Sequence, residues 1–168
     1  MKVNTTHFLT IDSINTTRKN IEKAVKTTPL QESFRLSKNF EAQIFLKRED
    51  LQPVRSYKLR GAYNKIKNLF AEGKTGKGIV CASAGNHAQG VAFSCHELQI
   101  HGVIFMPITT PKQKLEQVKM FGGDFVEVKL VGDTFDASKL AAIEYGEKSG
   151  AAFIHPFDDP QIIAGQAT

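Results

Sequence analysis

The sequence predicts an α/β fold in which helices cover both faces of a parallel sheet. In the second half of the chain, short apolar segments at 78–82, 101–106 and 124–128 alternate with segments that have the length and pattern of helices. Strands of a parallel sheet are buried on both faces and are joined by helical crossovers, so they are apolar along their length. The alternation therefore indicates a parallel sheet between two layers of helices.

The first half of the chain contributes two predicted helices and one predicted strand. A helix is predicted over 12–26, with Asp12 or Ser13 as its N-cap. A short strand is predicted over 43–48, and a second helix over 57–72. The apolar face of this second helix is made of Leu59, Ala62, Tyr63, Ile66, Leu69 and Phe70.

After a loop at 73–78, strands and helices alternate. The predicted elements are a strand at 78–82, a helix at 86–98, a strand at 101–106, a helix at 111–121, a strand at 124–128, a helix at 133–148, a strand at 152–154 and a helix that begins at 160. Pro111 and Asp133 stand near the starts of their helices, where these residue types are favoured. Since the chain stops inside that last apolar, helix-forming segment, we expect it to be a fragment.

The composition is that of a globular protein, and it excludes several functional classes. Cys81 and Cys95 lie 14 residues apart without a CxxC pattern or clustered histidines, so we expect free, buried thiols in a reducing compartment and no metal site. No apolar run is long enough to span a bilayer, and Met1–His7 lacks the apolar core of a secretory signal. We therefore expect a cytoplasmic protein without a membrane partner.

The net charge of +5 does not by itself indicate a nucleic-acid partner. Residues 1–74 hold 15 basic and 7 acidic side chains, whereas residues 75–168 hold 7 and 10. The basic residues of the first half are scattered singly among acidic and apolar ones, which is typical of a solvated surface. We expect no nucleic-acid partner.

Lys58 is the first candidate for covalent chemistry. It lies in the predicted first turn of its helix, which Ser56 can N-cap. The positive end of the helix dipole would lower the pKa of an amine there, and Schiff-base chemistry needs a neutral amine. The alternative is a solvated surface lysine, which is the commoner role of this residue type.

The turn Ser83–Gly90 is the second candidate site. It follows an apolar strand and opens a helix, the position at which α/β folds bind ligands and at which backbone N–H groups hold anions. Gly85 permits an unusual backbone angle and a close ligand approach. Asn86 and His87 are equally explained as helix caps. An amine that faces this turn could act on a substrate that carries a carboxylate.

Other motifs in the sequence give little indication of function. Gly73-Lys74-Thr75 resembles the end of a phosphate-binding P-loop, but Asn68 stands where its first glycine belongs and the motif precedes a strand. The glycine pattern of dinucleotide-binding folds does not occur. His155 stands beside an acidic pair, and we expect it to form a hydrogen-bonded turn.

Several ordered segments together resemble the fold-type II family of pyridoxal phosphate enzymes, and within it the threonine dehydratases. They are Leu46–Gln52, the Lys58 helix, Ser83–Ala92, Phe105–Pro107, Gly132–Phe135 and His155–Asp159. The Lys47–Asp50 form is more similar to the biosynthetic than to the catabolic enzymes. The resemblance implies deamination of L-threonine to 2-oxobutanoate and ammonia, as in isoleucine biosynthesis. The alternatives are a serine or hydroxy-amino-acid dehydratase and a catalytically inert fragment.

The resemblance also implies roles for individual residues. Lys58 would bind pyridoxal 5'-phosphate covalently and act as the base at the substrate Cα, and Asn86 would hydrogen-bond the ring hydroxyl of the cofactor. The substrate carboxylate would be received by Ser83, Ala84, Gly85, Asn86 and His87. Similar serine racemases carry a serine where this chain has Ala84, and alanine cannot shuttle a proton, so elimination is expected over racemisation.

The resemblance further implies a division into lobes. Residues 76–150 would form the complete small lobe, and residues 1–73 and 151–168 the opening parts of an incomplete large lobe. The glycine-rich loop for the cofactor phosphate would lie beyond Thr168. Tyr57 and Ala167 depart from the usual phenylalanine and glycine of the family. The full-length protein is expected to be a homo-oligomer.

Overall fold

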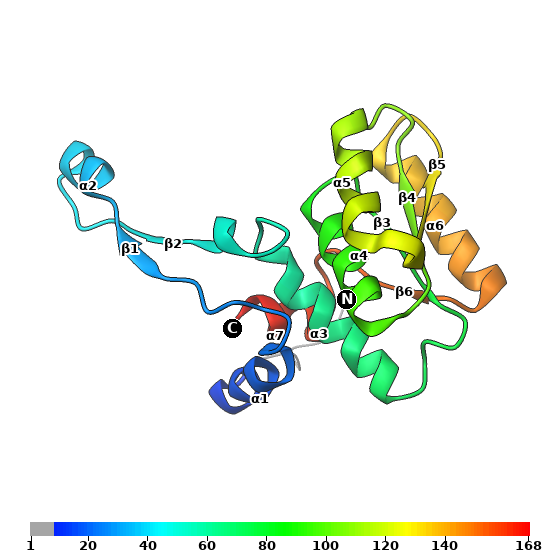
Figure 1. The fold of residues 1–168 in the computed structure, drawn as a ribbon, viewed down its shortest axis with the longest axis horizontal. Helices are drawn as coiled ribbons and strands as arrows, with labels where there is room; N and C mark the ends of the chain where they lie inside the picture. The colour runs from blue at the N-terminus through cyan, green and yellow to red at the C-terminus, as the bar shows by residue number, and fades with distance from the viewer. Residues whose placement is uncertain (1–8) are drawn as a thin grey trace, which may run out of the picture.

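The computed structural model describes residues 9–168, so the segment Met1–His7, in which no secretory signal is expected, lies outside the described residues. The central feature is a four-stranded parallel sheet with the spatial order β5-β4-β3-β6 (Figure 1). Its strands are β3 (Ile79–Ala82), β4 (Gly102–Met106), β5 (Val126–Leu130) and β6 (Ala152–Phe153). The parallel sheet that the sequence predicts is confirmed.

Helices cover both faces of the sheet, also as predicted. Alternate strand residues line the two faces: Ile79, Cys81, Ile104 and Met106 on one, and Val80, Ala82, Val103 and Phe105 on the other. The first face packs against α4 (Asn86–Leu98) and α5 (Lys112–Gly122), and the second against α6 (Phe135–Ser149) (Figure 1). The predicted bounds of α4 agree with the structure.

The order of the strands creates a topological switch point beside β3. From β3 the chain moves outward to β4 and β5, and it then returns to place β6 on the other side of β3, with Ile79 opposite Ala152 and Val80 opposite Phe153. Open α/β sheets bind ligands outside the carboxyl ends of the strands at such a point. The turn that follows β3 begins there.

Three further helices complete the body: α3 (Lys58–Ala71) packs on α4, and α7 (Pro160–Gln166) and α1 (Ile11–Ile21) pack on α3. The contacts of α3 are very close. A Cβ on Gly165 of α7 would lie 2.5 Å from the Cα of Gly61, and a Cβ on Gly90 of α4 would lie 3.2 Å from the Cα of Leu59. The start of α3 is therefore held between α4 and α7.

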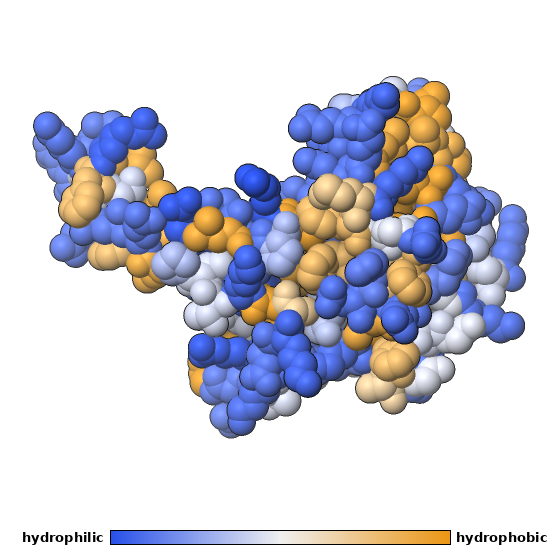
Figure 2. Space-filling model, viewed as in Figure 1, coloured by the Kyte–Doolittle hydropathy of each residue, from blue (hydrophilic) through white to orange (hydrophobic). Residues whose placement is uncertain are grey.

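An arm projects from this body (Figure 1). It consists of β1 (Leu30–Glu32), α2 (Phe34–Phe40) at the tip, β2 (Phe45–Lys47) and the short 3₁₀ helix η1 (Glu49–Leu51) at the base. β1 and β2 pair antiparallel. The arm exposes the apolar side chains Leu30, Phe34, Phe40, Phe45 and Leu46, which Figure 2 shows as hydrophobic colour on the projecting part. The sequence predicted β2 but neither β1 nor α2.

The predicted N-cap of the first helix is wrong by two or three residues. The hydroxyl of Thr10 accepts a hydrogen bond from the backbone N–H of Ser13 at 3.1 Å, so the N-cap of α1 is Thr10 and neither Asp12 nor Ser13. The N-cap of α6 is Thr134, so Asp133 stands directly before the cap, near the helix start as predicted. Threonine in extended conformation satisfies a free N–H of the first turn as well as aspartate does.

Other differences reflect tertiary packing. The first helix ends at Ile21 and not at residue 26, because the chain turns there and buries Ala24 and Val25. The strand predicted at 124–128 starts at residue 126, after the 3₁₀ helix η2 (Gly123–Phe125). Phe70, predicted on the inner face of α3, is 53% exposed.

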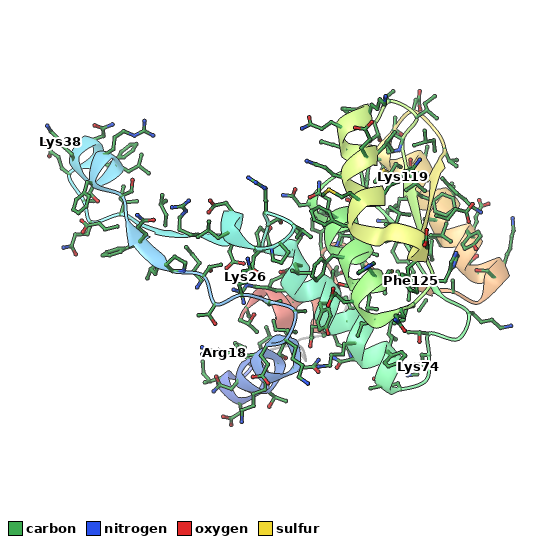
Figure 3. All side chains as sticks on the ribbon, viewed as in Figure 1. Arg18, Lys26, Lys38, Lys74, Lys119 and Phe125 are labelled. Atoms are coloured by element: carbon green, nitrogen blue, oxygen red, sulfur yellow. The ribbon has the colours of Figure 1, made fainter. Side chains whose placement is uncertain are left out.

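The cysteines lie where the sequence predicts, whereas the basic residues are only partly scattered, since one group of them surrounds a cavity beside α1. Cys81 and Cys95 are free and buried, and burial raises the pKa of the Cys95 thiol to about 12. Lys38 lies on the arm, Arg18 on α1 and Lys74 beyond the end of α3, so these basic side chains occupy separate parts of the surface (Figure 3). Within residues 9–168, no helix combines the length and the apolar character that crossing a membrane requires.

Candidate active site

Lys58 is the first residue of α3. The hydroxyl of Ser56 accepts a hydrogen bond from the backbone N–H of Lys58 at 3.1 Å, although the N-cap position itself is occupied by Tyr57. The predicted N-cap is therefore wrong by one residue, although Ser56 does satisfy a free N–H of the first turn. Because Gly90 packs on the adjacent backbone, the position of this turn is set by α4.

The side chain of Lys58 is half-buried and has three partners, one of which is the ring of Tyr57, whose centroid lies 5.6 Å from Nζ. The same Nζ donates a hydrogen bond to the carbonyl oxygen of Pro156 at 2.8 Å and lies 4.2 Å from the ring centroid of Phe157. Burial lowers the pKa of the amine from its ordinary value. The sequence analysis assigned such a lowering to the helix dipole, whereas in the structure its cause is removal from water.

The turn Ser83–His87 connects β3 to α4. Gln89 donates the first intrahelical hydrogen bond, to the carbonyl oxygen of Gly85 at 3.3 Å, so the backbone N–H groups at the start of α4 have no partner within the helix. A Cβ on Gly85 would meet nothing within 4 Å, so open space lies beside the turn. The backbone at Gly85 has a φ of −142° and a ψ of −146°, which is not the left-handed conformation. The arrangement can accept an anion.

Polar side chains at the turn are available for binding. The Oγ of Ser83 accepts a hydrogen bond from the N–H of Gly85 at 3.2 Å, which leaves the hydroxyl hydrogen free to donate. Asn86, the first residue of α4, is exposed. Ala84 is half-buried and contributes only a methyl group.

The side chain of His87 is not available to a substrate. It is 3% exposed, and its Nε2 lies 3.2 Å from the carbonyl oxygen of Ile154, so the ring carries its hydrogen on Nε2. Burial lowers the pKa of His87 to about 4, and the charge of Lys58 acts in the same direction. The neutral ring has a bare Nδ1, which is buried and has no partner among the described residues. From the sequence we expect the side chain of His87 to donate to the substrate. In the structure the ring is buried, so the group of His87 that can donate is its backbone N–H.

The start of α3, with Lys58, and the turn Ser83–His87 lie close together in the structure. The charge of Lys58 acts on His87, and both side chains are hydrogen-bonded to the same segment after β6, at Pro156 and Ile154. An amine and a set of free N–H groups therefore lie together at the switch point of the sheet. Sequence reasoning did not assign Pro156 and Phe157 to the site, and the motif His155–Asp159 was the signal that could have indicated them.

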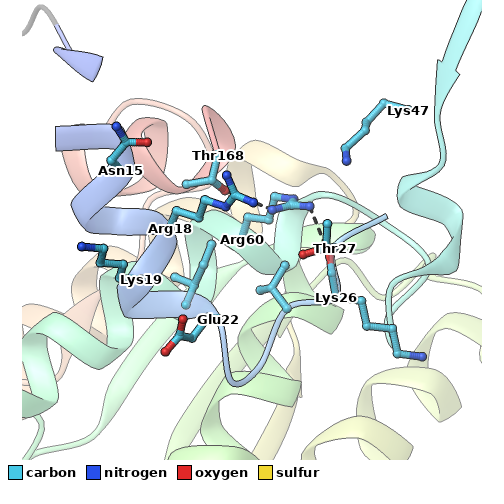
Figure 4. A pocket seen from close by; sticks show the side chains of 11 residues that line it. Asn15, Arg18, Lys19, Glu22, Lys26, Thr27, Lys47, Arg60 and Thr168 are labelled. Carbon is cyan, nitrogen blue, oxygen red and sulfur yellow. Dashed lines mark hydrogen bonds between the residues drawn. The ribbon is translucent and has the colours of Figure 1, made fainter. Parts of the chain in front are cut away.

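A cavity with a volume of about 620 Å³ lies elsewhere. It is bounded by α1, the start of α3 and the chain between α1 and β1, and Arg60 is bonded across it to Thr168 at 3.1 Å (Figure 4). Its side chains include the exposed basic residues Arg18, Lys19, Lys26 and Lys47. Neither Lys58 nor the turn Ser83–His87 lines it.

The fold and site together define an α/β protein with a half-buried amine of lowered pKa at the switch point of its sheet, an arrangement that suits covalent amine chemistry. A family profile described as "Pyridoxal-phosphate dependent enzyme" matches residues 21–168. The chain belongs to this family of pyridoxal phosphate-dependent enzymes.

Curated relatives include two biosynthetic L-threonine dehydratases named IlvA. The protein from Bacillus subtilis (strain 168) is 59% identical over 149 residues, which are 89% of this chain and 35% of the relative. The protein from Halalkalibacterium halodurans is 54% identical over 158 residues, which are 94% of this chain and 38% of the relative. The chain thus spans little more than a third of the length of these relatives.

Solved structures have the same fold. Processed threonine deaminase isoform 2 from Solanum lycopersicum is 42% identical with a TM-score of 0.82, over 95% of this chain and 44% of that one. Maize serine racemase is 32% identical with a TM-score of 0.84, over 92% of this chain and 46% of that one.

The residues present fit part of the family's cofactor. Lys58 offers an amine of lowered pKa to an aldehyde, and the space beside Gly85 and the exposed amide of Asn86 can receive a ring and its hydroxyl. The bound cofactor supplies an electron sink for a carbanion at the substrate Cα.

Proposed function

We propose that this chain carries the reactive lysine and the carboxylate-binding turn of a pyridoxal phosphate-dependent L-threonine dehydratase, which converts L-threonine to 2-oxobutanoate and ammonia. The observation that carries the proposal is the position of the Lys58 amine beside the start of α4, with both bonded to the segment after β6. The names of the relatives from B. subtilis and H. halodurans support the choice of substrate.

In this proposal the residues of the site act from two sides of one amino acid. The amine of Lys58 holds the cofactor and removes the Cα proton of the substrate. The hydroxyl of Ser83 and the backbone N–H groups of Gly85, Asn86 and His87 bind the substrate carboxylate, with the N–H of Gly85 leaving its bond to Ser83, and the amide of Asn86 bonds the ring hydroxyl of the cofactor. Binding the carboxylate at the helix start fixes the Cα next to the amine.

Ala84 favours elimination over racemisation. A racemase must return a proton to the face of the Cα opposite the lysine, and this requires a second acid on that side. The methyl group of Ala84, which forms the turn between Ser83 and Gly85, cannot supply a proton. We expect loss of the β-hydroxyl, with serine as a poorer or equal substrate beside threonine.

We also propose that the full-length protein is a cytoplasmic homo-oligomer that serves isoleucine biosynthesis. The biosynthetic names of the curated relatives support this role. The matched part covers only 35% and 38% of those relatives. The 168-residue chain alone is therefore expected to have little activity.

The test is the production of 2-oxobutanoate and ammonia from L-threonine by the full-length protein. Lys58→Ala is expected to lower the turnover rate by at least about 10²-fold, because the variant lacks the amine that binds the cofactor and moves the proton. It should also remove the near-visible absorbance of bound cofactor. The matched control is Lys114→Ala, an exposed lysine on α5. Undiminished turnover in Lys58→Ala would overturn the proposal, and L-serine measured in parallel decides the substrate preference.

A further inference from the structure

The turn His155–Phe157 surrounds the amine on which the proposed function rests. The carbonyl of Pro156 accepts from Nζ of Lys58 at 2.8 Å, and the ring of Phe157 lies 4.2 Å from the same atom. The face of an aromatic ring attracts a cation and not a neutral amine, and a carbonyl bonds a charged donor more strongly than a neutral one. Both partners therefore favour the ammonium form, against the effect of burial.

The backbone of this turn is held without any help from Lys58. The Nδ1 of His155 accepts hydrogen bonds from the N–H groups of Phe157 at 3.1 Å and Asp158 at 2.7 Å. Before the turn, Ile154 is bonded to the buried ring of His87. The carbonyl of Pro156 is thus an acceptor whose position is set by bonds other than the one to the lysine.

The other end of the turn is fixed as well. Asp159 caps α7 by accepting from the N–H of Gln161 at 2.8 Å, and its carboxylate pairs with Lys65 of α3 at 2.8 Å. The turn is therefore anchored to α3, the helix that carries Lys58.

The side chain of Phe157 differs from this backbone because it is 63% exposed. An exposed ring has little packing to hold it and can change rotamer without disturbing the fold. In this position the ring contacts the charge of Lys58 and, edge to face, the ring of His155, with the two ring centroids 6.4 Å apart. Phe157 is therefore the part of the turn that can move aside.

We propose that Pro156 and Phe157 form a clamp that holds Lys58 as an ammonium ion, and that Phe157 is a positioning residue whose displacement frees the amine to lose its proton to solvent and react. The clamp deepens the proposed function because it acts on the same lysine. It keeps the amine in place, and largely unreactive, until a ligand enters.

The test measures the reactivity of the Lys58 amine directly. The protein without added cofactor is labelled with trace acetic anhydride between pH 7 and 10, and the labelling of Lys58 is measured by mass spectrometry relative to the exposed Lys114. The ionisable side chains near this amine are His87 from α4 and His155 from the turn, and burial lowers the pKa of His87 to about 4, so His87 stays uncharged between pH 7 and 10. The profile at the upper end of the range therefore reports on the lysine.

Phe157→Leu removes the aromatic face and keeps an apolar side chain, and Phe157→Tyr is the matched control that keeps the ring. We expect Phe157→Leu to label two- to fivefold faster at pH 8, from the usual strength of an exposed cation–π contact, while Phe157→Tyr labels as the unchanged protein does. His155→Ala, which releases the backbone of the turn, should change the rate in the same direction. Equal labelling of the unchanged protein and Phe157→Leu, or faster labelling in both Phe157 variants, would overturn the clamp. Because labelling needs neither cofactor nor substrate, its failure is distinct from a failure of the lyase assay.

Discussion

His87 shows how burial decides the chemistry of a single residue. The position reads in the sequence as a polar group at a helix start, suited to donate to an anion. In the structure its ring lies in the interior with one bond to Ile154, and the charge of Lys58 nearby further disfavours protonation. His87, which the sequence suggested as a donor to a ligand, is thus a neutral residue that holds the segment after β6, and this segment contacts Lys58.

This burial predicts a stability effect with a defined pH range. The pKa of His87 falls from its ordinary value of 6.5 to about 4, chiefly through burial, so the unfolded chain binds a proton between these values and the folded chain does not. Stability from this residue is complete above pH 6.5 and is lost as the pH falls from 6.5 to 4, by about 3 kcal/mol as an order of magnitude.

Urea unfolding of the unchanged protein and of His87→Gln, compared at pH 7 and pH 4, measures this effect. Glutamine does not titrate and keeps an amide donor for Ile154. The loss of unfolding free energy between the two pH values should be larger in the unchanged protein by about the amount given above. The carboxylates titrate in both proteins, so their contribution cancels. Equal losses would show that His87 is not buried as a neutral ring.

At the scale of elements, the contact between α3 and α7 depends on two glycines. A Cβ on Gly165 would lie 2.5 Å from both the carbonyl oxygen of Arg60 and the Cα of Gly61, which are backbone atoms that cannot rotate away. Helix α3 carries Lys58 at its start, so a displacement of α7 against α3 would also shift the lysine. The crossing of these helices therefore connects stability with the geometry of the site.

Gly165→Ala should accordingly lower the free energy of unfolding by about 1–3 kcal/mol, the usual cost of forcing extra volume into a close contact. Chemical denaturation measures it. The matched control is Gly76→Ala in the loop before β3, where a Cβ would meet nothing within 4 Å, and a change within about 0.5 kcal/mol is expected there. A harmless Gly165→Ala would mean that the helices are further apart than the structure shows.

At the scale of the whole molecule, the chain divides into a packed body and a projecting arm (Figure 1). The base of the arm is anchored by Glu49, whose carboxylate accepts from the Nε and Nη2 of Arg60 at 2.8 Å each and from the hydroxyl of Thr28. Burial raises the pKa of Glu49, but these bonds outweigh burial and hold it below its ordinary value. Beyond this base, α2 at the tip has no buried residue.

We therefore predict very different local stabilities for the two parts. Amide hydrogens in β1 and β2 should exchange faster than those in β3 and β4 by a factor on the order of 10² or more, because an isolated two-stranded sheet is marginally stable in water. Hydrogen exchange followed by mass spectrometry measures the ratio. Repeating it at a tenfold lower protein concentration controls for association through the exposed apolar residues of the arm. Equal protection of the arm and the central strands at both concentrations would contradict the prediction.

The division into a small lobe over 76–150 and parts of a large lobe remains a proposal at this scale. β6 follows the proposed boundary in the chain, yet it hydrogen-bonds to β3 and extends the same sheet. The segment after β6 is thus connected on one side to the sheet and on the other to α3 and α7.

The sequence by itself determined the order of the body's elements, the parallel sheet and the two motifs that meet at the site. These follow from local signals, since apolar periodicity, caps and glycines act over a few neighbouring residues. Such signals did not predict β1 and α2, which bury few side chains and leave a weak pattern.

Only the tertiary structure decided that β6 returns to the side of β3. That return brings Pro156 and Phe157 to Lys58, nearly 100 residues away in the chain, and buries His87. It also decided that Phe70 faces solvent, although the helical period places it beside buried neighbours. The physical reason is that burial and strand order arise from packing between distant segments, whose energies do not depend on the local pattern of either one.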